Sequence, residues 1–239
     1  MGYFGPLYAP PLPSGPGTPL FDYNPEVSYT ANQGSAVLTP TTNGSPTTTT
    51  EAPVNSPAPN VALAKRALIR LSGASYSYGT TMATPANWTL FLVANSNATN
   101  DYCCGATNAG GANQNSWGGV HRVNTSNKLR IQCGDGIDAI MSDTDTFTWT
   151  NGQTYAISGR YTSGDNFVEV RVDGADEAAT TTGTATTCAG GPWTWSVGRF
   201  GAYTGNTWNG DIYRVVVYNS ALSDGDRASI ETQMMGYYL

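Results

Sequence analysis

Paired carboxylates are the first chemistry to look for, because hydrolysis of a glycosidic bond needs one acidic group on each side of it. The chain has five glutamates, namely Glu26, Glu51, Glu169, Glu177 and Glu231. The nearest approach to a pair is the stretch Glu169 to Asp173, in which alternate side chains share one face of a strand. Arg171 lies between the two acids and would hold both ionised, which is the wrong state for a general acid. We therefore expect a structural row of ion pairs here, and no catalytic residue.

His121 is the only histidine. A catalytic imidazole needs a nucleophile and an orienting acid, and the sequence identifies neither. The sequence also contains no nucleophile elbow, phosphate-binding loop or dinucleotide fingerprint. We expect a protein that is not an enzyme.

Acidic residues are concentrated in CGDGIDAIMSDTDTF. Their carboxylates could bind Ca²⁺, which prefers oxygen ligands. The candidate ligands are Asp135, Asp138, Asp143 and Asp145. Because the spacing is not that of an EF-hand and aspartate is common in turns, the alternative is that the protein has no cofactor.

The four cysteines are Cys103, Cys104, Cys133 and Cys188, which allow three pairings. Adjacent cysteines are poorly placed to bond to each other. We expect free, buried thiols, as in a protein made in a reducing compartment. Zinc is disfavoured, because the chain has no CxxC motif and one histidine.

Sugar-binding sites combine an aromatic surface with amides and carboxylates, because a pyranose has an apolar face and a rim of hydroxyl groups. Aromatic residues occur among Gly and Asn in GGANQNSWGG and GAYTGNTWNG. The predicted glycan-binding residues are Tyr102, Trp117, Tyr203, Asn206 and Trp208. The alternative is that Trp117 and Trp208 cap the core or contact a neighbouring subunit.

Several apolar or alternating segments predict strands separated by turns rich in Gly, Asn and Ser. They are Ala67–Leu71, Thr89–Asn95, Lys128–Cys133, Thr154–Tyr161, Asn166–Gly174, Thr194–Phe200 and Asp211–Asn219. One short helix follows, with Ser223 as N-cap and with Leu222 and Ile230 as anchors on the sheet. The prediction is an all-β jelly-roll sandwich with a short C-terminal helix.

Residues 1–60 differ in composition from residues 61–239, since no Lys or Arg occurs before Lys65. The start of the chain interleaves proline with large apolar side chains, which suits an extended segment that docks on another protein surface. The predicted docking residues are Tyr3, Phe4, Leu7, Tyr8, Leu12 and Phe21. Plain disorder is the alternative interpretation.

A net charge of −6 and only 12% charged residues argue against nucleic acid as a partner. No stretch approaches the roughly 20 apolar residues that span a bilayer, so no membrane role is expected.

The segment Gly210 to Asn219, followed by Ala221-Leu222-Ser223 and an acidic helix, resembles the last strand and helix of concanavalin A-like lectin/glucanase (laminin G-like) domains. ALIRLSG, WTLFLVAN, VEVRVDG and SVGRF are also similar to segments of that family, and the resemblance covers roughly residues 61–239. It implies a concanavalin A-like sandwich, although the Glu-x-Asp-x-x-Glu motif of the family's glucanases begins at none of the five glutamates.

Such domains occur in lectins, polysaccharide hydrolases, adhesion proteins and bacteriophage virion proteins. The N-terminal segment favours a virion structural protein, such as a capsid decoration or fibre component, on the outer surface of the particle. Its expected partners are other virion proteins, further copies of itself and surface glycans. The alternatives are a free carbohydrate-binding module and a polysaccharide hydrolase.

Overall fold

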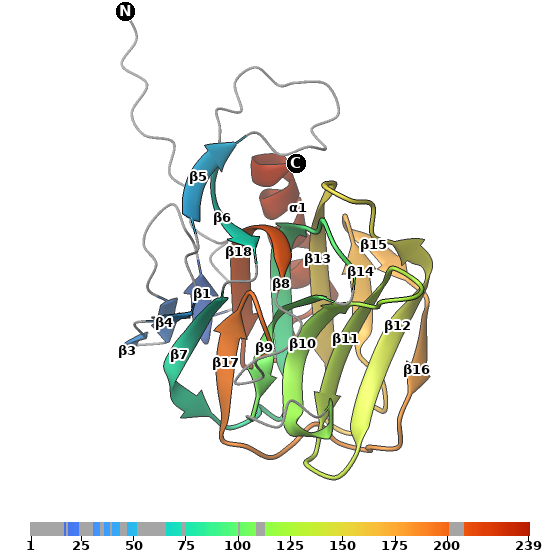
Figure 1. Ribbon diagram of the computed structural model, residues 1–239. Coiled ribbons are helices and arrows are strands. Elements are labelled where there is room, and N and C mark those ends of the chain that lie inside the picture. Colours follow the sequence, from blue (N-terminus) through green and yellow to red (C-terminus); the bar gives the residue numbers. More distant parts are fainter. Residues whose placement is uncertain are drawn as a thin grey trace, which may run out of the picture.

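The computed structural model describes residues 17, 19–23, 31–33, 36–38, 40–43, 47–51, 66–72, 75–99, 101–108, 113–200 and 208–239. Within them, two antiparallel sheets of eight strands face each other, and one helix covers the outer face of one sheet (Figure 1).

The first sheet carries the helix. Its order is β15 (Ala175–Glu177), β14 (Glu169–Val172), β13 (Thr154–Tyr161), β8 (Trp88–Asn95), β18 (Asn209–Tyr218), β6 (Arg66–Ser72) and β5 (Thr47–Glu51), with β1 (Phe21–Tyr23) also paired to β18.

The second sheet lies on the other side of the core. Its order is β16 (Ala179–Thr182), β12 (Ala139–Thr148), β11 (Lys128–Gly134), β10 (Ser116–Arg122), β9 (Asp101–Thr107), β17 (Trp193–Val197), β7 (Ser75–Met82) and β4 (Pro40–Asn43). A hairpin of β2 (Ala31–Gln33) and β3 (Ala36–Leu38) and a 3₁₀ turn, η1 (Asn113–Asn115), complete the described elements apart from the helix.

Strand β8 is buried along its whole length. Leu90 and Leu92 point into the core between the sheets, whereas Phe91 and Val93 point outward and pack under the helix. Successive side chains of a strand face opposite sides, so only burial on both faces explains an unbroken apolar run.

Helix α1 (Asp224–Tyr238) is fixed at its start as the sequence predicts. The Ser223 hydroxyl accepts a hydrogen bond from the backbone N–H of Asp226, and Asp224 and Asp226 lie in the first turn, where the helix dipole favours anions. Leu222 and Ile230 pack against the outer face of the first sheet. The predicted sandwich of jelly-roll type with a short C-terminal helix is confirmed.

Three of the described strands that precede residue 61 pair with strands of the two large sheets. β1 pairs with β18, β5 with β6 and β4 with β7, whereas β2 and β3 pair only with each other. Strands β5 and β4 form one lateral edge of the molecule, opposite the edge formed by β15 and β16 (Figure 1).

No helix in the described part of the chain is long and apolar enough to cross a membrane.

The first prediction concerns the attachment of β1. Arg214 is 95% buried, and both terminal oxygens of Asp22 accept hydrogen bonds from its guanidinium, at 2.9 and 2.7 Å. Asp22→Asn leaves a buried cation without its carboxylate, so we expect the free energy of unfolding to fall by about 1–3 kcal/mol. The measurement is urea denaturation beside Asp138→Asn, which makes the same charge change at an exposed position. Equal midpoints for the two variants would contradict this role for Asp22.

Candidate functional site

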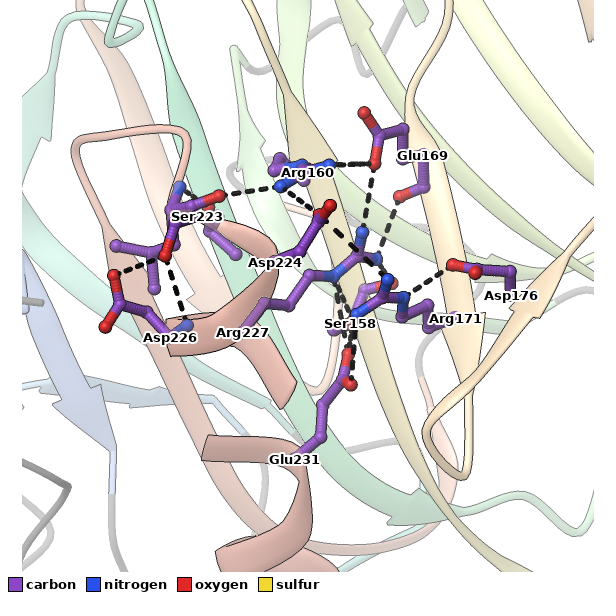
Figure 2. A network of polar contacts seen from close by, with 12 residues as sticks. Ser158, Arg160, Glu169, Arg171, Asp176, Ser223, Asp224, Asp226, Arg227 and Glu231 are labelled. Atoms are coloured by element: carbon purple, nitrogen blue, oxygen red, sulfur yellow. Dashed lines mark hydrogen bonds and ion pairs between the residues drawn. The ribbon is translucent and has the colours of Figure 1, made fainter. Parts of the chain in front are cut away.

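A cluster of charged residues joins the helix to strands β13 and β14 (Figure 2). Arg227 of α1 is fully buried at its centre and donates to the Ser158 hydroxyl at 2.8 Å and to the Glu169 carboxylate at 3.2 Å. Arg160 donates to the same carboxylate at 2.6 Å, and Ser158 donates to the carboxylate of Glu231. Burial lowers the pKa of the Arg227 guanidinium to about 10. Ion pairs are present as expected, but their partners differ: Glu169 is bound by Arg160 and Arg227, whereas Arg171 binds Asp176 and Glu231.

Asp173, the second acid of the sequence pair, belongs to a turn. Asp173 and Gly174 link β14 to β15 with positive φ angles of 50° and 77°, which suit a tight hairpin turn. The Asp173 carboxylate accepts a hydrogen bond from the backbone N–H of Ala156 at 2.8 Å. Both acids thus have structural partners.

A groove of about 530 Å³ opens beside the cluster, at the edge where the chain passes from the first sheet to the second. Its lining comes from β14, β15, β16 and the residues just before β14. The lining residues are Asn166, Phe167, Val168, Glu169, Val170, Asp176, Glu177, Ala179 and Thr181.

The groove combines an apolar ring with polar groups. Phe167 is 40% exposed and, with Ile137, is one of the two exposed large hydrophobic residues in the described part of the chain. The Asp176 carboxylate lies 2.5 Å from the Arg171 guanidinium, which lowers the pKa of Asp176. Glu177 accepts a hydrogen bond from the Thr146 hydroxyl at 2.8 Å. The site thus offers a ring surface, carboxylate acceptors and an amide within one hollow.

Phe167, Asn166 and Glu177 were not among the site residues predicted from the sequence. The alternation around β14 was the available signal, because Val168, Val170 and Val172 are buried and Phe167, just before the strand, falls on the opposite side of that alternation. A large aromatic residue in that position predicts an exposed ring.

Two predicted glycan-binding residues are wrong, because Trp117 and Trp208 are fully buried. The Trp117 ring packs against Trp88 and Trp195 between the sheets, and the Trp208 ring packs edge-on against Trp149. A ring without exposed surface presents no face to a sugar, so the alternative interpretation as core residues holds.

Tyr102 is half-buried in a short stack of rings, with its centroid 4.3 Å from that of His121 and 5.1 Å from that of Phe200. It lies on β9, in the second sheet, and does not line the groove. Tyr203 and Asn206 lie outside the described residues. So do the predicted docking residues Tyr3, Phe4, Leu7, Tyr8 and Leu12, while Phe21 is described by its backbone in β1.

The predicted calcium ligands do not converge. Asp143 is held by Arg130 at 2.6 Å, Asp145 accepts from Thr180 at 2.7 Å, and Asp135 accepts the backbone N–H groups of its own turn. Among the residues that the structure describes, no group of three or more acidic, His or Cys side chains could hold a metal ion. Asp135 and Asp138 lie in the turn between β11 and β12, and Asp143 and Asp145 lie along β12, so the four residues are close in sequence without forming one site.

All four cysteines are free and buried, as expected. Burial and the Cys104 thiol raise the pKa of Cys103 well above the usual value of a thiol, and burial and the Cys188 thiol do the same for Cys133.

Two buried ionisable groups lie on neighbouring strands of the second sheet. Burial raises the pKa of Asp101 to about 6, against the opposing effects of the Asn209 backbone N–H and Arg122. Burial and Arg130 lower the pKa of His121 to about 4, against the opposing effect of Asp143. Near neutral pH His121 is therefore uncharged.

The second prediction follows from Asp101. Its pKa is higher in the folded chain than the 3.8 of a free carboxyl, so its contribution favours folding at low pH and is lost as the pH rises through about 6. Asp101→Asn removes this dependence. We expect the stability of the native chain relative to the variant to fall by up to about 3 kcal/mol between pH 4 and pH 7.

Denaturant unfolding of both proteins across this range is the measurement, and the contribution of His121 cancels in the difference. Parallel stability curves would show that Asp101 titrates normally.

No protein-family model matches the chain, and a search of curated proteins finds no match. Solved structures do show similarity. A mutant of NanB sialidase from Streptococcus pneumoniae has a TM-score of 0.51 at 15% identity, over 67% of this chain and 27% of the sialidase. The chain therefore spans about a quarter of the sialidase's length.

Two further structures have TM-scores below 0.5. Domain 4 of AbnA, a GH43 extracellular arabinanase from Geobacillus stearothermophilus, scores 0.48 at 16% identity, over 79% of this chain and 88% of the domain. A heptameric SAP-like pentraxin from Limulus polyphemus scores 0.47 at 15% identity, over 65% and 73% of the respective chains. At such identities the similarity concerns the fold alone, which here is a sandwich of two antiparallel sheets.

Proposed function

We propose that the protein is a non-enzymatic, glycan-binding β-sandwich whose ligand lies in the groove at the β14–β16 edge. The observation that carries this proposal is the exposed Phe167 ring at a hollow that also holds Asn166, Glu177 and Thr181. An apolar ring supports the apolar face of a pyranose, and the polar side chains meet its hydroxyl groups.

The charge of the lining defines the class of glycan. Glu169, Asp176 and Glu177 line the groove, and no Lys, Arg or His does. Arginines outside the lining bind Glu169 and Asp176, whereas Glu177 accepts from a neutral hydroxyl. A sugar acid would meet like charge without a cationic partner, so the groove suits uncharged sugars.

Hydrolysis has less support, since Glu169 is held by two arginines and Asp173 by a turn. Release of reducing sugar that is lost in Glu169→Gln or Asp173→Asn would favour a hydrolase.

The third prediction tests the groove. Phe167→Ala removes the ring surface, so affinity for a bound neutral oligosaccharide should fall roughly 5- to 30-fold, equivalent to about 1–2 kcal/mol. Calorimetric titration of the full chain with neutral oligosaccharides of several backbones measures it. Ile137→Ala is the matched control, because Ile137 is also a large exposed hydrophobic residue but lies outside the groove.

Equal affinity of the native chain and Phe167→Ala would place the ligand elsewhere on the molecule. Loss of binding in both variants would mean that general surface apolarity, and not the groove, is responsible.

As the wider setting we propose a virion surface protein attached through its N-terminal segment. The position of β1 supports it, because β1 follows residues 1–16 in the chain and pairs with β18 on the side away from β8, β13 and β14. A segment that leads into β1 can hold the protein to a support without covering the ligand.

The fourth prediction concerns assembly. Deletion of residues 1–16 removes Tyr3, Phe4, Leu7, Tyr8 and Leu12 and keeps β1 with Asp22. If these side chains dock between copies, light scattering should give an oligomer for the full chain and a monomer for the shortened chain, with equal melting temperatures. A shortened chain that stays assembled would contradict the docking role, and two monomers would leave a free glycan-binding module.

A further inference from the structure

Two of the four cysteines are neighbours although they are far apart in sequence. Cys133 lies on β11, and Cys188 lies in residues 183–192, the segment that links β16 to β17. Both side chains belong to the core between the sheets, at 0% and 3% exposed, and the Cys188 thiol adds to burial in raising the pKa of Cys133.

Backbone contacts hold the two residues side by side independently of the sulfur atoms. Ala189 follows Cys188, and Gly134 follows Cys133. The N–H of Ala189 donates to the carbonyl of Gly134 at 3.2 Å, so the two residues that follow the cysteines are hydrogen-bonded to each other. The N–H of Cys188 donates to the Tyr161 hydroxyl at 2.8 Å. A bond between the sulfurs therefore needs little movement of the chain.

Further backbone hydrogen bonds attach residues 183–192: the N–H of Ala185 donates to the carbonyl of Ala139 at 3.4 Å, and the N–H of Thr84 donates to the carbonyl of Gly190 at 3.1 Å. The segment contains no helix or strand, and only Ala185 and Cys188 within it are buried. It crosses the end of the second sheet from β16, at one edge, to β17, which lies between β9 and β7. A covalent bond at Cys188 would fasten this crossing to β11.

We propose that Cys133 and Cys188 are a disulfide-forming pair that fastens residues 183–192 to β11 when the protein meets an oxidising thiol buffer. One thiolate attacks glutathione disulfide, which gives a mixed disulfide and one glutathione. The second thiolate then attacks the protein sulfur and releases the second glutathione. The two cysteine thiols lose two protons and two electrons, and the electrons reduce one glutathione disulfide to two glutathione molecules.

Burial controls the rate of this exchange. Thiolates are the reactive species, and the raised pKa of Cys133 leaves few of them in the folded chain. The bond therefore forms most readily during folding, before the core closes over the sulfurs.

The remaining cysteines provide an internal comparison. Cys103 and Cys104 are adjacent on β9, both are buried, and the Cys104 thiol adds to burial in raising the pKa of Cys103. The backbone between adjacent residues disfavours ordinary disulfide geometry, so this pair should stay reduced under the same conditions.

The fifth prediction is tested by refolding the full chain in glutathione disulfide with a trace of glutathione. After an acid quench, N-ethylmaleimide labelling in denaturant and intact-mass measurement count the free thiols. We expect two labels after oxidation and four after treatment with dithiothreitol, and a peptide map that joins Cys133 to Cys188. The bond closes a long loop and should raise the melting temperature by about 10 °C.

Cys188→Ala and Cys133→Ala should each abolish the cross-link and the gain in melting temperature, whereas Cys103→Ala, also at a buried position, should keep both. If a variant fails to fold, the melting temperatures of the oxidised native chain before and after treatment with dithiothreitol give the same comparison. Four labels after oxidation, a persistent mixed disulfide with glutathione, or a bond that involves Cys103 or Cys104 would overturn the proposal.

Discussion

Strands β8 and β18 pair with each other while one face of each meets the opposite sheet and the other meets helix α1. Phe91, Val93, Val216 and Tyr218 would otherwise lie on the surface of the sheet, and each such side chain contributes about 1.5–3 kcal/mol when it is buried. The helix is thus the cover that allows two strands to be apolar throughout. The sandwich can place its most hydrophobic strands at the centre of the first sheet because a third layer shields them.

The same helix also shapes the groove. Arg227 of α1 binds Glu169, which belongs both to the charged cluster and to the groove lining. A buried arginine needs such partners, because an unpaired charge in the interior is strongly unfavourable. The β14–β15 hairpin is consequently held on one face by Val170 and Val172, which pack in the core, and on the other face by the ion pair between Glu169 and Arg227 of the helix. A ligand that contacts Phe167 meets a surface whose geometry is set before it binds.

Apolar runs and alternation located β8, β11, β13, β14 and β18, and Ser223 located the start of the helix, because these signals arise from local burial and capping. Strands β9, β10 and β12 were not expected, since their Cys, Gly, Asp and Ser residues resemble those of turns. The same composition affects the site: the glycines that follow Trp117 are typical of a loop, yet Trp117 lies on β10 with its ring in the core. The groove depends on β14, β15 and β16 meeting at one edge, and such long-range pairing leaves no local pattern in the sequence.

The opposite pKa shifts of Asp101 and His121 have a consequence for the proton balance of folding. At about pH 5 the unfolded chain carries an ionised carboxyl and a charged imidazole at these positions, whereas the folded chain holds both groups neutral. Folding then takes one proton from the imidazole and supplies one to the carboxyl, and the solvent gains and loses none through this pair. A stability profile that is level around this pH would thus conceal two groups that both disfavour the fold there and whose opposite pH dependences cancel.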